Sequence, residues 1–378
     1  MRESTLLLLG ILFVSCSSDY ETVDDGAQVF PEKEYYGTVI LRNQYDVNDF
    51  GSEHYTHIQG SLYVKDDGHH TPITDLSPLI SISYIRDDLW IDFNDNLIEL
   101  TGFENLETVE GKLLIRENHN LKKISAFPNI NHIGGEVFIS NPELEELGGF
   151  SKLSDISSLT IGTGDHIATE ISGFDNLTSI EGEVLLAGLK DIAILKNLPF
   201  NPSSNIRLYR FPLLTHLDDL SHITEIGGSL IVEDLPNLEN INGLSNLNVV
   251  KEDLKLKGLP KLASIGGLSS LSIVKGELSL WNLPAISNVD ELSNLIFAKY
   301  LRLSSLDLIT HLDGLSSLRG ELEGTNFQMW HLSIGDNPAL RDFCGIRPLL
   351  LESSPSLYVS DNYYNPSKND IVNGNCSI

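Results

Sequence analysis

The sequence has few cysteines, few basic residues and no hydrophobic run long enough to cross a membrane. Three cysteines among 378 residues are too few for a disulfide-dense scaffold. The chain has 25 Lys and Arg against 53 Asp and Glu, a formal net charge of −28. This balance argues against a nucleic-acid-binding protein, because that class needs a basic surface. The longest apolar run, residues 6–14, is about half of the roughly 20 residues that a transmembrane helix needs.

The chain also lacks the short motifs that mark common catalytic sites. No glycine-rich phosphate loop, GxSxG, HExxH or CxxC is present, and the eleven His residues are scattered. We therefore predict that the protein is not an enzyme and needs no cofactor. A weak candidate for a metal site is the group Asp66, Asp67, His69 and His70, whose oxygen and nitrogen atoms suit a divalent cation. For this group, and for the GTGDH stretch at 162–166, the alternative is a solvated polar turn.

Residues 1–15 have the pattern of a cleaved signal peptide. Arg2 precedes the apolar run, and the small residue Ser15 stands directly before Cys16. The segment resembles the lipobox of bacterial lipoproteins, although Phe13 stands where Leu is usual. The resemblance implies that the Cys16 thiol is acylated and that the lipid alone attaches the protein to the membrane. The alternative is an ordinary secretory signal with a chance cysteine.

Residues 16–57 are predicted to form a lipidated acidic tether and an N-terminal cap. The tether begins SSDYETVDDG, which is polar and acidic and has no periodic apolar face. This start resembles the signal that sends Bacteroidota-type lipoproteins to the outer face of the outer membrane. We therefore expect an exported outer-membrane lipoprotein at the cell surface; the alternative is a solvated linker with no role in sorting.

One unit repeats along most of the chain with a period of 24 residues. The apolar residues of 230–250 recur at 254–274, so that Leu230 and Val232 become Leu254 and Leu256. Within a unit the apolar residues are spaced by two and then by three, as in a short strand followed by inward-facing corners. Gly, Pro, Asn and Asp interrupt every segment, which excludes long amphipathic helices. The pattern predicts an all-β solenoid in which strands of successive repeats pair in parallel.

Aligning the first inward strand residue of each unit gives about thirteen rungs of ~24 residues. The aligned residues are Leu62, Leu89, Leu113, Val137, Leu159, Val184, Ile206, Leu230, Leu254, Leu278, Leu301, Leu332 and Leu357. The spacing slips mainly at 65–72 and 319–330, which we expect to be loops. At roughly 4.8 Å between stacked strands, the rungs would form a rod on the order of 60 Å long.

The repeat carries a resemblance to a known family. The unit IxGxLxLxxLPxLxxIxGLxxL at 226–247 and 250–271 resembles the receptor L domain of insulin-receptor-type ectodomains, a relative of the leucine-rich repeat. The resemblance covers about residues 58–360 and implies a right-handed parallel β-helix that binds a ligand and catalyses no reaction. We expect none of the cysteine-rich module, transmembrane helix or kinase of those receptors. Residues 58–341 are assigned to the solenoid.

Residues 342–378 break the pattern and are predicted to cap the solenoid. An open solenoid end exposes core and a strand edge, so a terminal unit of different composition is expected. The segment holds Cys344 and Cys376. A disulfide between them is permitted in an exported protein and would contribute on the order of 3 to 4 kcal/mol in the chain-entropy description. The alternative is two free thiols buried in the cap.

The residues between the inward strand positions project from the parallel sheet and form the predicted ligand-binding face. We count two outward rows, at the positions one and three residues after the first inward residue of each strand. Together they contain six Lys or Arg and two acidic residues, whereas acidic residues outnumber basic ones in the whole chain. Aromatic residues lie among these cations, a combination typical of recognition surfaces. The candidate residues are Tyr63, Trp90, Phe138, Arg207, Tyr209, Lys255, Lys257, Trp281 and Arg302. The alternative is that aromatic residues are there because they suit strands.

These observations predict a non-catalytic surface lipoprotein for adhesion or recognition. The expected partner is an extracellular protein or a polysaccharide, because a face of rings and cations suits either, and no nucleic acid is expected. A second hypothesis is a structural lipoprotein of the cell envelope without a specific ligand. A third is a polysaccharide-acting enzyme, since β-solenoids can carry such sites.

Overall fold

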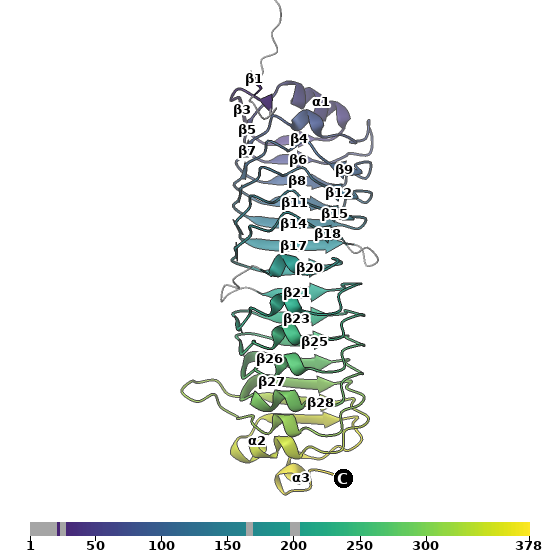
Figure 1. Ribbon diagram of the computed structural model, residues 1–378, viewed down its shortest axis with the longest axis vertical. Coiled ribbons are helices and arrows are strands. Elements are labelled where there is room, and N and C mark those ends of the chain that lie inside the picture. The colour runs from purple at the N-terminus through teal and green to yellow at the C-terminus, as the bar shows by residue number, and fades with distance from the viewer. Residues whose placement is uncertain (1–20, 23–27, 164–168, 197–204) are drawn as a thin grey trace, which may run out of the picture.

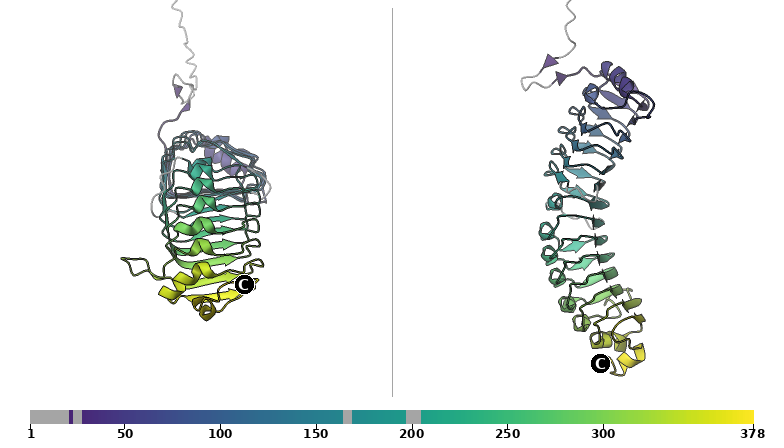
Figure 2. Two further views of the ribbon diagram at one scale, coloured as in Figure 1. Left: turned by 60° about the horizontal axis from the view of Figure 1, so that its bottom comes forward. Right: turned by 90° about the vertical axis from the view of Figure 1, so that its right-hand side faces the viewer.

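The structure is a computed structural model that describes residues 21–22, 28–163, 169–196 and 205–378. The chain winds into a tall stack of strand-bearing turns, with the N-terminal end at one end of the stack and the C-terminus at the other (Figure 1). The rod is bowed, and the strands of its longest sheet lie along the concave side (Figure 2). Cys16 and the 164–166 part of the GTGDH stretch lie outside the described residues.

Parallel sheets dominate the described part of the chain, which confirms the predicted all-β parallel solenoid. The longest sheet has 16 strands among the described residues. Its register joins the predicted inward residues: Leu62 pairs with Leu89, Leu230 with Leu254, and Leu332 with Leu357. The strands are β4 (Val39–Leu41), β6 (Leu62–Val64), β8 (Leu89–Asp92), β11 (Leu113–Arg116), β14 (Glu136–Asn141), β17 (Ser158–Thr163), β20 (Val184–Ala187), β21 (Ile206–Tyr209), β22 (Glu225–Ile226), β23 (Leu230–Glu233), β24 (Val249–Val250), β25 (Leu254–Lys257), β26 (Ile273–Trp281), β27 (Phe297–Ser304), β28 (His331–Gly335) and β29 (Ser356–Ser360).

Shorter strands form smaller sheets at the other corners of the coil. One sheet contains β3 (Glu34–Tyr36), β5 (His57–Gln59), β7 (Tyr84–Ile85), β10 (Thr108–Val109) and β13 (His132–Ile133). Another contains β9 (Glu99–Leu100), β12 (Lys123–Ile124), β15 (Glu146–Leu147) and β18 (Glu170–Ile171). Two pairs remain: β16 (Asp155–Ile156) with β19 (Ser179–Ile180), and the antiparallel β1 (Glu21–Thr22) with β2 (Gln28–Val29). The parallel sheets thus begin within residues 16–57, because β3 and β4 pair with β5 and β6.

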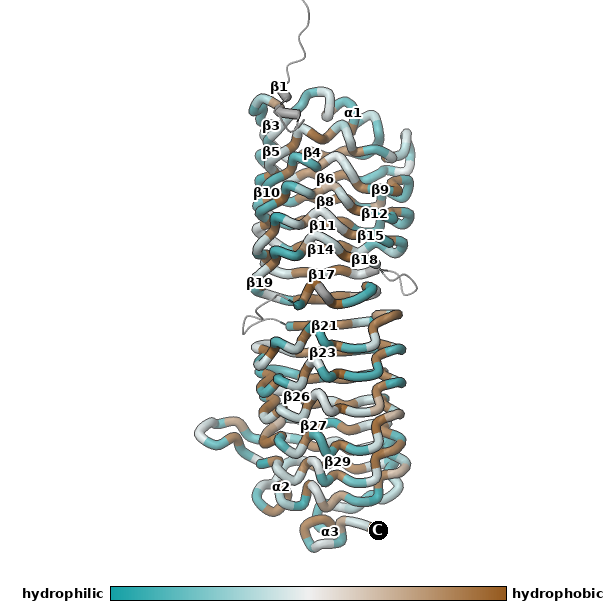
Figure 3. The backbone as a smooth tube through the Cα atoms, viewed as in Figure 1, coloured by the Kyte–Doolittle hydropathy of each residue, from teal (hydrophilic) through white to brown (hydrophobic). Residues whose placement is uncertain are grey.

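The core is one continuous column of inward side chains. Apolar and polar residues alternate along each turn, rung after rung (Figure 3), and the inward residues of the strands, such as Leu230 and Val232, are completely buried. Buried Asn side chains also form a ladder: the Nδ2 of Asn118 donates to the Oδ1 of Asn141 at 3.0 Å and to the backbone oxygen of Ile91 at 2.9 Å. The ladder satisfies turn backbone groups, as expected for an inward Asn.

Glycines allow the turns to stack closely on the side opposite the long sheet. Gly243 in the 3-10 helix η4 (Asn242–Leu244) and Gly267 in η5 (Gly266–Leu268) each lie against the turn before. A Cβ atom at either position would lie 1.8 Å from a backbone oxygen, of Leu217 for Gly243 and of Ile241 for Gly267. Since no Cβ atom fits at such a distance, the recurring Gly-Leu pair of the repeat is a steric requirement of the stack. The other 3-10 helices are η1 (Ser77–Leu79), η2 (Ala193–Leu195), η3 (Asp218–Leu220), η6 (Asp290–Asn294), η7 (Asp313–Leu315) and η8 (Cys344–Ile346).

Helices lie at both ends of the rod (Figure 1). At the N-terminal end, α1 (Gln44–Ser52) is capped by Asn43, whose side chain accepts a hydrogen bond from the backbone N–H of Asp46. At the C-terminal end lie α2 (Arg347–Glu352) and α3 (Lys368–Val372). The structure contains the predicted disulfide between Cys344 and Cys376, which ties the last residues to the coil. No helix among the described residues has the length and apolar character needed to span a bilayer.

Candidate ligand-binding face

The N-terminal rungs present a row of large apolar side chains along the concave sheet. We define the N-terminal patch as Ile40, Tyr63, Trp90, Leu114 and Phe138, which pair side by side on β4, β6, β8, β11 and β14. The rings of Tyr63 and Trp90 lie 5.6 Å apart. Ile40 is 46% exposed and extends the row beyond the predicted residues. Leu114 is buried within the row, while the other four side chains are at least partly exposed. Exposed apolar side chains gathered in this way are a feature of interaction surfaces.

A second group of predicted residues lies close together on the same sheet, beginning three rungs after Phe138. We define the central patch as Arg207, Tyr209, Glu233, Lys255, Lys257, Trp281 and Arg302, on β21, β23, β25, β26 and β27. In one row across the sheet, Tyr209 pairs with Glu233, Glu233 with Lys257, and Lys257 with Trp281. The strands β17 and β20 separate the two patches. All nine predicted face residues therefore lie on one sheet, but they form two groups.

Cations hold the aromatic rings of the central patch in place. The Lys257 ammonium lies 4.7 Å from the centroid of the Trp281 ring, and the Arg302 guanidinium lies 5.0 Å from the same ring. Arg207 lies 5.6 Å from the ring of Tyr209. Cation–π contacts of this kind contribute about 0.5 to 1 kcal/mol each at exposed sites. The rings are therefore presented as rigid surfaces.

Glu233 links the cations of the central patch. Its carboxylate accepts a hydrogen bond from Nη2 of Arg207 at 2.8 Å and another from the ammonium of Lys257, and the residue is buried. Burial raises the pKa of the Glu233 carboxyl, but the hydrogen bonds and positive charges of Lys257 and Arg207 outweigh burial and hold it below its usual value near 4.5. Glu233 also raises the pKa of the Lys257 ammonium. At neutral pH the Glu233 carboxylate and the cations of Arg207 and Lys257 therefore form one connected cluster of ion pairs.

The sheet face carries less unpaired positive charge than the count of basic residues in the two outward rows suggested. Lys255 contacts Asp253 at 2.8 Å and Glu277 at 3.0 Å, and both carboxylates come from the outward row that precedes the two rows counted in the sequence. Arg116 lies 3.9 Å from Asp92 in the N-terminal half. Most cations of the face are therefore neutralised by neighbours on the same sheet. The arrangement can bind by ring stacking and fixed hydrogen bonds more readily than by net charge.

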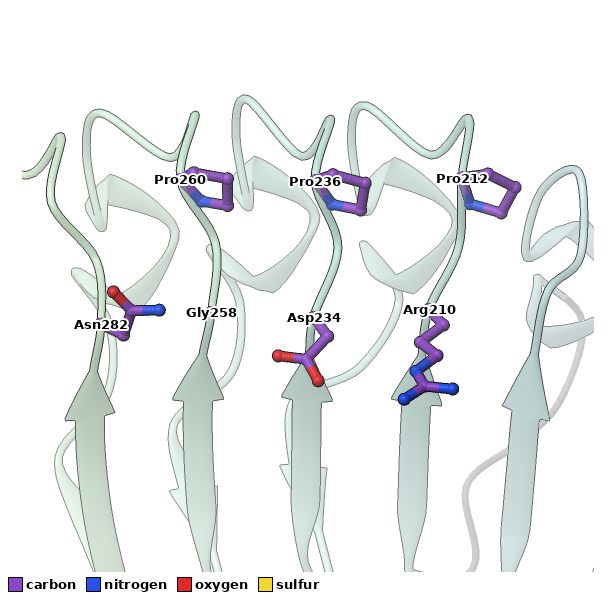
Figure 4. Close-up of a pocket in the computed structure, with 7 residues that line it drawn as sticks. All are labelled: Arg210, Pro212, Asp234, Pro236, Gly258, Pro260 and Asn282. Atoms are coloured by element: carbon purple, nitrogen blue, oxygen red, sulfur yellow. The ribbon is translucent and has the colours of Figure 1, made fainter. Parts of the chain in front are cut away.

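A groove that the sequence analysis did not identify adjoins the central patch (Figure 4). It has a volume of about 430 Å³. One side is formed by the residues that directly follow the strands, and the other by prolines of the turns. The lining residues are Arg210, Asp234, Gly258 and Asn282 in the first row and Pro212, Pro236 and Pro260 in the second. The signal that could have located it is the proline that recurs every 24 residues after a large apolar residue, in Phe211-Pro212, Leu235-Pro236 and Leu259-Pro260.

Backbone geometry fixes the first row of this groove. Arg210, Asp234, Gly258 and Asn282 have φ values of 51°, 56°, 63° and 55°, in the left-handed region. Each turns the chain immediately after Tyr209, Glu233, Lys257 or Trp281, so the groove is continuous with one row of the central patch. Because each rung repeats the same turn, the groove runs across successive rungs, along the long axis of the rod.

The weak metal candidate does not assemble into a metal site. The Asp66 carboxylate accepts hydrogen bonds from the backbone of Gly68 at 2.8 Å and of Ile73 at 3.0 Å. Asp67 accepts one from the backbone of His69 at 2.9 Å, and its other oxygen lies 2.9 Å from the ring of His70. Both carboxylates therefore hold turns together. Among the described residues, no group of three or more His, Cys, Asp or Glu is arranged to bind a metal ion.

One protein family matches part of the chain. The family described as the receptor L domain matches residues 56–161, a range that includes Tyr63, Trp90 and Phe138 of the N-terminal patch. The match confirms the resemblance over residues 56–161 and indicates a ligand-binding role. The units at 226–247 and 250–271, which suggested the resemblance, lie outside the matched range. The central patch and its groove lie outside the matched range. A comparison with curated proteins finds no match.

Proposed function

We propose that this protein is a non-catalytic binding protein at the cell surface, anchored by an acylated Cys16, whose concave sheet face binds an extracellular protein or glycan. The supporting observation is the central patch, where Tyr209 and Trp281 are fixed by cations beside a groove. We take the coil to be right-handed, the hand of nearly all parallel strand crossovers, with about thirteen rungs of ~24 residues.

The geometry favours an extended ligand that lies along the rod. Similar backbone turns recur from rung to rung along the groove, at a spacing of roughly 4.8 Å. The residues that precede these turns form the adjoining row of Tyr209, Glu233, Lys257 and Trp281. A linear chain lying along this axis can therefore make similar contacts at successive rungs. Rigid rings add contact area with little loss of side-chain entropy, and Glu233, Arg207 and Lys257 provide fixed polar groups.

The test is a binding screen with the Tyr209→Ala and Trp281→Ala double variant. The wild-type protein is applied to arrays of linear glycans and of extracellular proteins, and the affinity for each captured ligand is then measured by calorimetry. We expect the double variant to bind at least about tenfold more weakly, since each ring contributes on the order of 1 kcal/mol. Tyr358→Ala is the matched control, because Tyr358 is 56% exposed on the last strand of the same sheet. Equal affinity of the double variant and wild type would show that the central patch is not the binding site.

A further inference from the structure

The loop predicted at 319–330 is a hairpin that projects from the side of the rod between β27 and β28 (Figure 1). Its two arms are joined by hydrogen bonds from the backbone of Met329 to Gly320 at 2.7 Å and from Leu322 to Phe327 at 3.0 Å. The backbone of Trp330 donates to the oxygen of Lys299 at 2.9 Å, which ties the end of the hairpin to β27. The hairpin is thus an ordered part of the rod.

Aromatic side chains gather where the hairpin joins the coil. We define the hairpin base as Lys275, Lys299, Tyr300, Phe327 and Trp330. Trp330 is 60% exposed and Phe327 is 38% exposed. The rings of Tyr300 and Trp330 lie 6.4 Å apart with their planes at 57°. Large exposed rings on an ordered backbone form a rigid surface for stacking.

The two lysines of the hairpin base lie against these rings. The Lys299 ammonium is 5.5 Å from the Tyr300 ring and 5.3 Å from the Trp330 ring, and the Lys275 ammonium is 5.5 Å from the Phe327 ring. In the described parts of the chain, neither lysine forms an ion pair with a carboxylate. The cations Arg207, Lys255 and Lys257 of the central patch are neutralised. The hairpin base therefore keeps positive charge available in a strongly acidic protein.

We propose that the hairpin base is a second binding site, which takes an acidic saccharide. The apolar face of a sugar ring stacks on Trp330, and its carboxylate is placed between the ammonium groups of Lys299 and Lys275. The charges are complementary, and a peptide cannot add as a strand to the long sheet here, because β27 and β28 are each paired with strands on both sides. A rigid sugar ring also loses little conformational entropy on binding. This site shares no residue with the central patch, so it does not depend on the function proposed for that patch.

The test is calorimetric titration of the folded protein with oligogalacturonate, alongside the corresponding neutral galactose oligomer. We expect the acidic oligomer to bind and the neutral one to bind at least about tenfold more weakly. Trp330→Ala, and separately the pair Lys275→Gln and Lys299→Gln, should each weaken binding of the acidic oligomer at least about tenfold. The pair should also reduce the dependence of affinity on salt, because exposed charges are screened by ions.

Tyr363→Ala is the matched control for these variants. Tyr363 is also 60% exposed and carries Arg341 at 4.8 Å from its ring, but it lies in the C-terminal cap. It should leave the affinity unchanged. The proposal is overturned if the acidic oligomer does not bind, if the lysine pair variant binds it unchanged, or if polyglutamate competes equally well. Loss of binding in Trp281→Ala alone would place the saccharide on the central patch and would likewise overturn the second site.

Discussion

Glu233 contributes both to the stability of the fold and to the arrangement of side chains on the candidate face. It is buried on the outward side of β23 and accepts hydrogen bonds from Arg207 on β21 and Lys257 on β25. A buried carboxylate costs free energy unless it is paired, and here cations on both neighbouring strands pair with it. The same contacts fix the two cations that touch Tyr209 and Trp281. Removing the carboxylate should therefore affect both stability and the face.

We predict that Glu233→Gln lowers the free energy of unfolding by about 1 kcal/mol at pH 7. The folded pKa of Glu233 is below its usual value, so its stabilisation is present above the unfolded pKa near 4.5 and is lost as the pH falls through the folded pKa. The difference between variant and wild type should therefore shrink between pH 5 and pH 3. Urea unfolding at pH 7, 5 and 3 measures it, with the exposed Glu239→Gln as control. A difference as large at pH 3 as at pH 7 would contradict the pKa argument.

At the scale of single elements, the strands were predictable and their side-chain partners were not. The inward residues recur every 24 positions, and burial on one face fixes the register. Strand β4 was not predicted, although Val39 and Leu41 lie 23 residues before Leu62 and Val64, close to the period of the repeat. The pairing of Lys255 with Asp253 and Glu277 was missed because it joins an outward row that was not counted. The groove depends on left-handed turn residues of four different types, which no single residue type marks.

Two adjacent glycines of η5 provide a test of the stacking argument. We predict that Gly267→Ala destabilises the protein by roughly 1 to 3 kcal/mol, because the new Cβ would overlap the backbone oxygen of Ile241 and push two turns apart. Gly266→Ala is the matched control, since the nearest atom to its Cβ is the Ser264 hydroxyl at 3.3 Å. Thermal unfolding followed by circular dichroism compares the two. Equal melting temperatures would show that the turns are not stacked as described.

At the scale of the whole molecule, the rod places two different surfaces on one scaffold. In the central patch Arg207, Lys255 and Lys257 are paired with carboxylates beside a groove along the axis. Within the described residues, Lys275 and Lys299 of the hairpin base have no carboxylate partner. A solenoid can carry both because each rung contacts mainly its neighbours, so an excursion at one rung leaves the register of the others intact. Both surfaces are useful only where large extracellular ligands can reach them. The proposed anchor at Cys16 would provide that location.

We predict that Cys16→Ala moves the protein from the membrane fraction to the soluble fraction of cells that express it. Acyl chains contribute about 0.8 kcal/mol for each buried methylene, and the described residues contain no helix able to span a bilayer. Protease added to intact cells should digest the wild-type protein, because the tether would hold the rod outside the cell. Immunoblots of both fractions, before and after protease, measure these outcomes, and Ser17→Ala is the control for the substitution itself. Wild-type protein that is protected from protease would contradict surface display and would favour a structural role inside the envelope.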